Sequence, residues 1–141
     1  QGISLEVAKQ LAEQNRVSLI STLRRMVKTN LKSIAIVVWR LKNKPAELPR
    51  ANQSTLSGFL YELPKKLRVQ NSYTSQNFTA SIHPNKSAPD DSTVYKAFGL
   101  PYGKIIRKSE CLQLEKGDTK TYYVESMRYY GNDTVISLLH E

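Results

Sequence analysis

The apolar positions over residues 4–29 recur with the period of two short helices. Ser4 can cap the first helix, which runs to about Gln14, and Asn15-Arg16 then breaks the pattern as a turn. A second cap at Ser18 opens a helix with one apolar and one polar face. The apolar faces consist of Leu5, Val7, Ala8, Leu11 and Ala12 in the first helix and of Leu19, Ile20, Leu23, Met26 and Val27 in the second.

The polar face of the second helix carries Ser21, Arg24, Arg25 and Lys28. A tight turn, a small alanine in the first helix and a basic outer face on the second are features of a helix-turn-helix, whose second helix can enter the major groove of DNA. A solvated helix surface has the same pattern. Because two helices cannot enclose a core, the pair must rest on the following sheet, on an upstream domain or on a second copy of itself.

Residues 33–41 (SIAIVVWRL) predict a strand that is buried on both faces and central in its sheet, because polar residues hardly interrupt the β-branched run. The next segments are expected to form an exposed loop at 42–54, a short helix or strand at 55–63 and a strand at 66–72. Asp90 and Asp91 are candidate caps of a short helix at 92–98, which Gly99 and Pro101 end.

The last part of the chain predicts an antiparallel meander. Three strand-like runs, at 104–114, 120–130 and 134–139, are separated by turn sequences at 115–118 and 131–133. In the middle run one alternating set should pack on helices while the other stays wet. These sets are Tyr122, Val124 and Ser126 on one face and Tyr123, Glu125 and Met127 on the other.

The expected fold class is therefore α+β, in two parts. A helix-turn-helix-like preface at 1–31 precedes a domain at 32–141 with an antiparallel sheet of about five strands and one or two short helices. GAF, PAS and UTRA-type sensory domains share this outline, although a fold by itself does not assign a function.

The net positive charge is confined to the first half of the chain. Residues 1–68 hold 13 Lys and Arg against 4 acids, whereas residues 69–141 hold 8 of each, and the net charge is +9. Such clustering favours a polyanionic partner, with nucleic acid ahead of an acidic protein or a membrane surface. The candidate contact residues for DNA or for a protein partner are Ser18, Ser21, Arg24, Arg25 and Lys28.

Composition narrows the class of protein further. Cys111 is the single cysteine, so no disulfide can form within the chain, and no apolar run approaches the roughly 20 residues that span a bilayer. We expect a cytoplasmic protein without a membrane partner. The sequence starts at Gln1 in a segment that is soon helical, which we interpret as a C-terminal fragment of a longer protein.

The layout of four segments resembles the C-terminal part of ImmA/IrrE-family proteins. These segments are VSLISTLRRMVKTNLKSIAIVVWR at 17–40, SYTSQNF at 72–78, DSTVYKAF at 91–98 and ESMRYYGNDTVISLLHE at 125–141. Proteins of that family combine a zinc metallopeptidase domain, a helix-turn-helix and a GAF-like sensory domain, and they relieve repression in bacterial stress responses or mobile elements. The resemblance implies the regulatory half of such a protein, with Ser18, Ser21, Thr22, Arg24 and Arg25 on its second helix.

No catalytic set is recognisable in this sequence. The family's HExxH motif is missing, and neither His83 nor His140 has a second ligand four residues away. We expect a non-catalytic chain without a cofactor, with zinc only in a missing N-terminal domain. Cys111 is expected to pack within a strand, and Asp90 and Asp91 to act as caps and not as a carboxylate pair.

Tyrosine is the commonest aromatic residue, with eight copies against three Phe and one Trp. A sensory pocket for a small molecule can combine aromatic walls with a polar anchor. The candidate lining residues are Tyr73, Tyr95, Tyr102, Tyr122 and Tyr123, with Arg107 as the anion-binding group. Alternatively, these tyrosines cover the half-exposed face of an antiparallel sheet. The sequence leaves the ligand open, as it does a UTRA-like effector domain, a protein-interaction module and a dimer.

Overall fold

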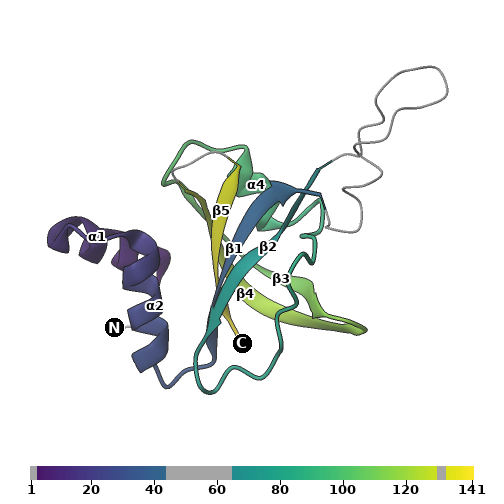
Figure 1. The fold of residues 1–141 in the computed structure, drawn as a ribbon, viewed down its shortest axis with the longest axis horizontal. Helices are drawn as coiled ribbons and strands as arrows, with labels where there is room; N and C mark the ends of the chain where they lie inside the picture. Colours follow the sequence, from purple (N-terminus) through teal and green to yellow (C-terminus); the bar gives the residue numbers. More distant parts are fainter. Residues whose placement is uncertain (1–2, 44–64, 130–132) are drawn as a thin grey trace.

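The computed structural model describes residues 3–43, 65–129 and 133–141, and it has the expected α+β architecture (Figure 1). Within these ranges the elements are α1 (Leu5–Asn15), α2 (Leu19–Thr29), β1 (Ile34–Lys42), β2 (Lys66–Thr74), α4 (Thr93–Phe98), β3 (Ile105–Glu115), β4 (Asp118–Arg128) and β5 (Thr134–His140). The helix or strand expected at 55–63, and nearly all of the loop expected at 42–54, fall outside the described residues.

The strands form one antiparallel sheet in the order β2-β1-β5-β4-β3. β1 lies between β2 and β5, with Ile36 opposite Tyr73 on one side and Leu138 on the other. The three last strands form the predicted meander, and the turn between β3 and β4 includes Gly117 at a φ of 86°. The last strand therefore joins the meander to β1.

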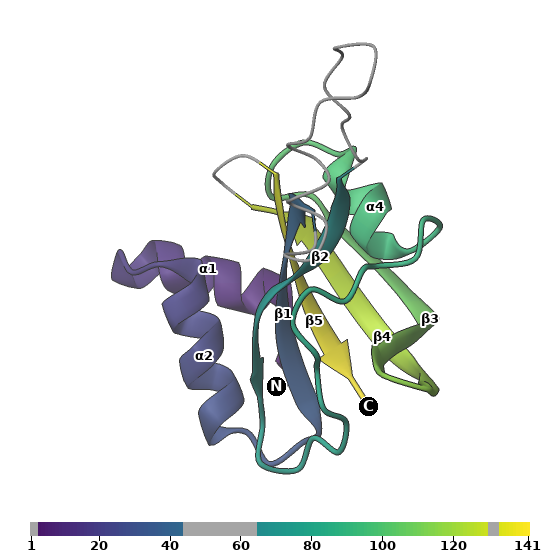
Figure 2. The same ribbon diagram turned by 45° about the vertical axis from the view of Figure 1, so that its right-hand side comes forward.

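Side chains on the two faces of the sheet build two separate cores. α1 and α2 pack on one face, here called the helix-pair face, and α4 packs on the other, the α4 face (Figures 1 and 2). The helix-pair core includes Leu5, Ala8, Leu23, Val27, Ile34, Ile36, Met127, Ile136 and Leu138. The core on the α4 face includes Ala35, Val37, Trp39, Leu67, Val94, Leu112, Val124 and Leu139. Of the three supports left open by the sequence, the helix pair thus uses the sheet.

β1 supplies side chains to both cores, which explains its uninterrupted apolar sequence. Ile34 and Ile36 pack under the helix pair, while Val37 and Trp39 lie on the α4 face. Every residue from Ile34 to Trp39 is buried. The prediction of a strand buried on both faces is therefore confirmed. A polar residue at any of these positions would lose its contact with water, which explains why the run is apolar.

The helix pair is fixed by the caps that the sequence predicts. Ser4 Oγ accepts the backbone N–H of Val7 at 3.1 Å, and Ser18 Oγ accepts that of Ser21 at the same distance. α1 ends at Arg16, whose φ of 53° is left-handed. Because Ala8 is fully buried, its small side chain allows α1 to lie close to its neighbours.

α4 is capped differently from the prediction. Ser92 precedes the helix and Asp90 and Asp91 are exposed, so the aspartates are not its caps. Glu110 of β3 takes that role, since its carboxylate accepts the backbone N–H of Thr93 at 3.0 Å and the Thr93 hydroxyl at 2.7 Å. The cap comes from a neighbouring strand, which a search for local cap residues does not detect.

A chain of hydrogen bonds continues from this cap across the core of the α4 face. The Trp39 indole donates to Ser137 Oγ at 2.9 Å, Ser137 and Ser126 hydroxyls are 2.7 Å apart, and Ser126 and Thr93 hydroxyls are 2.9 Å apart. Because the Thr93 hydroxyl donates to Glu110, it must accept from Ser126, which must accept from Ser137. Each hydrogen bond in this series therefore joins one donor to one acceptor.

The expectation of a wet face on β4 is wrong for two residues. Tyr123 is exposed as predicted, but Met127 is 2% exposed because it lies under the helix pair. Glu125 is also 2% exposed, and its carboxylate is held by Arg107 Nε and His140 Nε2, each at 3.1 Å. A buried carboxylate needs such partners, and alternation along one strand does not show them.

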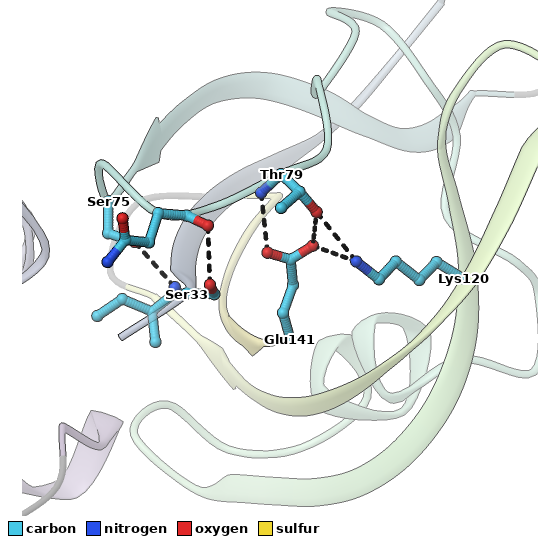
Figure 3. Close-up of polar contacts among 7 residues, drawn as sticks. Ser33, Ser75, Thr79, Lys120 and Glu141 are labelled. Carbon is cyan, nitrogen blue, oxygen red and sulfur yellow. Dashed lines mark hydrogen bonds and ion pairs between the residues drawn. The ribbon is translucent and has the colours of Figure 1, made fainter. Parts of the chain in front are cut away.

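Polar contacts at one end of the sheet hold the segment after β2 (Figure 3). Ser75 Oγ accepts the N–H of Ile34 at 3.0 Å. The Glu141 carboxylate accepts the N–H of Thr79 at 2.8 Å and also binds the Thr79 hydroxyl and the Lys120 ammonium. Burial raises the pKa of Glu141, but the hydrogen bonds from Lys120 and Thr79 outweigh it and hold the pKa below its ordinary value.

Candidate polyanion-binding face

The predicted contact residues all lie on α2 or at its start, and two of them serve the helix itself. Ser18 Oγ accepts the Ser21 N–H and donates to Ser21 Oγ at 2.7 Å, while the Thr22 hydroxyl donates to the Ser18 carbonyl at 3.1 Å. These hydroxyls stabilise the first turn of α2. Three basic side chains remain as candidate contacts.

Arg24, Arg25 and Lys28 are exposed on the side of α2 that faces away from its buried residues. We call these three residues the α2 basic face. A groove of about 550 Å³ runs beside them, between α2 and the end of β2. Its lining includes all three basic residues together with Ser21, Tyr73, Thr74 and Gln76.

Tyr73 restricts the position of one cation of the α2 basic face, Arg24. It lies on β2, on the helix-pair face of the sheet, and the guanidinium carbon of Arg24 is 4.5 Å from the centre of its ring. Stacking on an aromatic face restricts the arginine side chain but leaves its N–H groups free to point outward in the guanidinium plane. Such a preorganised donor suits a phosphate or a carboxylate.

A second group of cations lies at the far end of β1 and β2. Arg40 is directly opposite Arg68, and Lys42 is directly opposite Lys66. Burial, with the charges of Arg40 and Arg68, lowers the pKa of Lys42. Among the described residues, the cations of residues 1–68 are thus divided between α2 and other parts of the fold, which the count along the sequence does not separate.

The tyrosines of the predicted pocket lie in separate places. Tyr73 is beside α2, whereas Tyr95 belongs to α4 on the other face of the sheet, where its hydroxyl accepts the N–H of Leu67 at 2.9 Å. Tyr102 lies after α4, with its ring centre 5.2 Å from the guanidinium carbon of Arg128. Among the described residues these three do not line a shared cavity.

Arg107 and Tyr123 lie on the wet part of β3 and β4. Arg107 binds Glu125, and the ring of Tyr123 is 5.7 Å from that of His140. Tyr122, on the opposite side of β4, is buried and stacks on Phe78 with ring centres 6.0 Å apart. The Arg107–Glu125–His140 cluster was not recognised from the sequence, because its members come from three strands.

Residues with reactive or metal-binding side chains are dispersed. His83 is exposed in the segment before α4, and Cys111 is an exposed residue of β3, with its sulfur 3.2 Å from the Thr121 hydroxyl. Within the part of the chain that the structure describes, no three His, Cys, Asp or Glu side chains gather closely enough to hold a metal ion. None of the described helices is both long and apolar enough to cross a bilayer.

No protein-family model matches this chain, and no curated protein matches it. The resemblance to ImmA/IrrE-family proteins therefore stays a prediction that rests on the four segments quoted above.

Proposed function

We propose that this chain is a non-catalytic regulatory module that binds a polyanion, in the first place DNA, through Arg24, Arg25 and Lys28. The observation that carries the proposal is the position of Arg24 over Tyr73 beside the groove along α2. Three exposed cations on one helix face, one of them preorganised, can contact phosphates of a nucleic acid backbone.

The remainder of the proposal rests on the sequence resemblance. It assigns the module to the regulatory half of an ImmA/IrrE-type stress or transcription regulator, with the sheet domain as the sensor and zinc in a separate peptidase domain. The alternative is a UTRA-like effector domain of a transcription factor, with a small-molecule ligand and no peptidase. The two parents differ upstream, where the first has an HExxH motif and the second a winged helix.

A protein partner is the second candidate, and one feature favours it. On the outer side of the helix pair, Leu11 and Val17 are 38% and 50% exposed, and with Met26 and Arg25 they line a groove of about 450 Å³. An acidic amphipathic segment of a repressor could place its apolar side chains there and its carboxylates near Arg25.

The proposal is tested by fluorescence anisotropy with generic duplex DNA at about 50 mM salt. We expect the Arg24→Ala/Arg25→Ala variant to bind roughly 10- to 100-fold more weakly, because two phosphate contacts are lost. Lys108→Ala/Lys116→Ala is the matched control, since it removes the same charge from exposed positions on the β3–β4 hairpin. Equal losses in the two variants would reduce the effect to net charge, and wild-type protein that does not bind would exclude DNA.

A further inference from the structure

A cavity of about 520 Å³ lies where the turn between α1 and α2 meets the end of β4. Its volume is within the range of sites for small molecules. Its lining comes from four parts of the chain and includes Lys9, Arg16, Ser18, Tyr102, Met127 and Arg128. The cavity is therefore shared between the helix pair and the sheet domain.

The charges around the cavity favour an anion. Lys9, Arg16 and Arg128 line it, and Glu13 is the acidic residue in the lining. A concave surface with an excess of positive charge concentrates anions, because the low-dielectric walls focus the field. Met127, which is 2% exposed, supplies an apolar surface next to these cations.

Arg128 is held in place at the edge of the cavity. Its guanidinium carbon is 4.9 Å from the ring centre of Phe98 and 5.2 Å from that of Tyr102, so two aromatic rings restrict its position. Its Nε is buried and makes no hydrogen bond within the described residues. Since this Nε is closed to solvent, an anion in the cavity would be attracted by the positive charge of the Arg128 guanidinium and not by this N–H.

Lys9 holds together two segments that line the cavity, α1 and the loop at Gly103. Its ammonium donates to the Gly103 carbonyl at 3.2 Å and so ties α1 to the loop that carries Tyr102. Gly103 has a φ of 80°, a backbone conformation that favours glycine, and a Cβ there would lie 3.0 Å from Lys9 Nζ, which would then have to shift. The cavity is thus built by specific contacts and is not a gap between loose segments.

From this geometry we propose that the cavity binds a small organic anion that carries a carboxylate or a phosphate group. The site contacts Ser18 and Leu19 at the start of α2, the helix that carries the basic face. It gives the proposed sensory role a location, and ligand binding here does not depend on whether α2 binds DNA.

The test uses benzoate as a carboxylate probe and AMP as a phosphate probe, with inorganic phosphate for the bare anion. Isothermal titration calorimetry on the full chain is expected to give a Kd below about 1 mM for benzoate or AMP. The methyl NMR signal of Met127 should shift on binding, whereas that of Met26, which lies on the outer side of the helix pair, should not. Whichever probe binds identifies the anionic group.

Two variants connect the binding to the cavity. Arg16→Asn and Arg128→Gln are each expected to weaken binding at least about tenfold, because each removes a cation from the site. We expect Arg16→Asn to keep the fold, since asparagine tolerates the left-handed backbone at this position. This variant therefore tests binding in the cavity even if Arg128→Gln does not fold. Lys116→Ala is the control for charge at a distant turn.

Three results would overturn the inference: no probe binds at about 5 mM, Arg16→Asn binds as well as Lys116→Ala, or binding leaves the Met127 methyl signal unchanged. None of these results touches the DNA proposal, which depends on Arg24 and Arg25 and on a different measurement.

Discussion

Arg24 and Tyr73 belong to different elements and meet at 4.5 Å, which ties the α2 basic face to the edge strand β2. An exposed stacking contact of this kind is worth about 0.5–1 kcal/mol. We predict that Tyr73→Leu weakens binding of duplex DNA about two- to fivefold, while Tyr73→Phe keeps the ring and the affinity. Fluorescence anisotropy measures both, and equal affinities of the two variants would show that the stacking does not matter.

Tyr122 makes the stability of the fold sensitive to high pH. Burial, together with the charges of Glu141 and Glu115, raises its pKa to about 12. The folded state therefore holds the phenolic proton more tightly than the unfolded chain, so this stabilisation is full below about pH 10 and is lost as the pH rises through about 12.

The expected consequence is a steeper alkaline loss of stability in the wild type than in Tyr122→Phe, which keeps the ring that stacks on Phe78. Urea unfolding midpoints between about pH 9 and pH 12 measure the difference. Tyr123→Phe, on the exposed side of β4, is the control and should follow the wild type. If Tyr122→Phe loses stability over the same pH range as the wild type, the buried phenol is not the cause.

At the scale of elements, α4 depends on a strand for its cap. Because Glu110 accepts both the N–H and the hydroxyl of Thr93, we predict that Glu110→Ala destabilises the fold by about 1–2 kcal/mol. Gln113→Ala on the same strand is an exposed control and should be nearly neutral. Urea unfolding compares the two, and a Glu110→Ala variant as stable as the control would refute this role.

How much of each element the sequence predicts depends on where its stabilising contacts come from. The helix pair and the meander are encoded locally, by caps at Ser4 and Ser18 and by alternation along the strands, and these predictions agree with the structure. The cap of α4 and the burial of Glu125 depend on partners in other strands. Such contacts appear only when the strand order is known, and the sequence pattern does not contain it.

In the candidate sites, too, the sequence predicts local patterns but not contacts between distant segments. The α2 basic face is a local helix pattern, and the sequence identifies its three basic residues. The contact of Arg24 with Tyr73 and the cavity beside Arg128 join segments distant in sequence, so residue types could not place them. The pocket predicted from the sequence rests on residue type alone, and the structure places two of its tyrosines, Tyr73 and Tyr95, on opposite faces of the sheet.

At the scale of the whole molecule, the sheet contacts both α2, which carries the basic face, and the cavity at the end of β4 that we propose as a ligand site. Met127 takes part in this connection, since it packs in the helix-pair core and also lines the cavity at the end of β4. A ligand in that cavity would contact residues of both the helix pair and the sheet, which is the arrangement expected when a signal in one part alters binding by the other.

The proposed function depends on the α2 basic face, which we propose binds a polyanion through phosphate contacts. The most direct test is the slope of log Kobs against log salt concentration, between about 50 and 200 mM, for duplex DNA with the wild type and with Arg24→Ala/Arg25→Ala. Because each phosphate contact releases counterions, we expect a steep negative slope for the wild type and a slope shallower by about two in the variant. A wild-type slope near zero, or the same slope in both proteins, would contradict it.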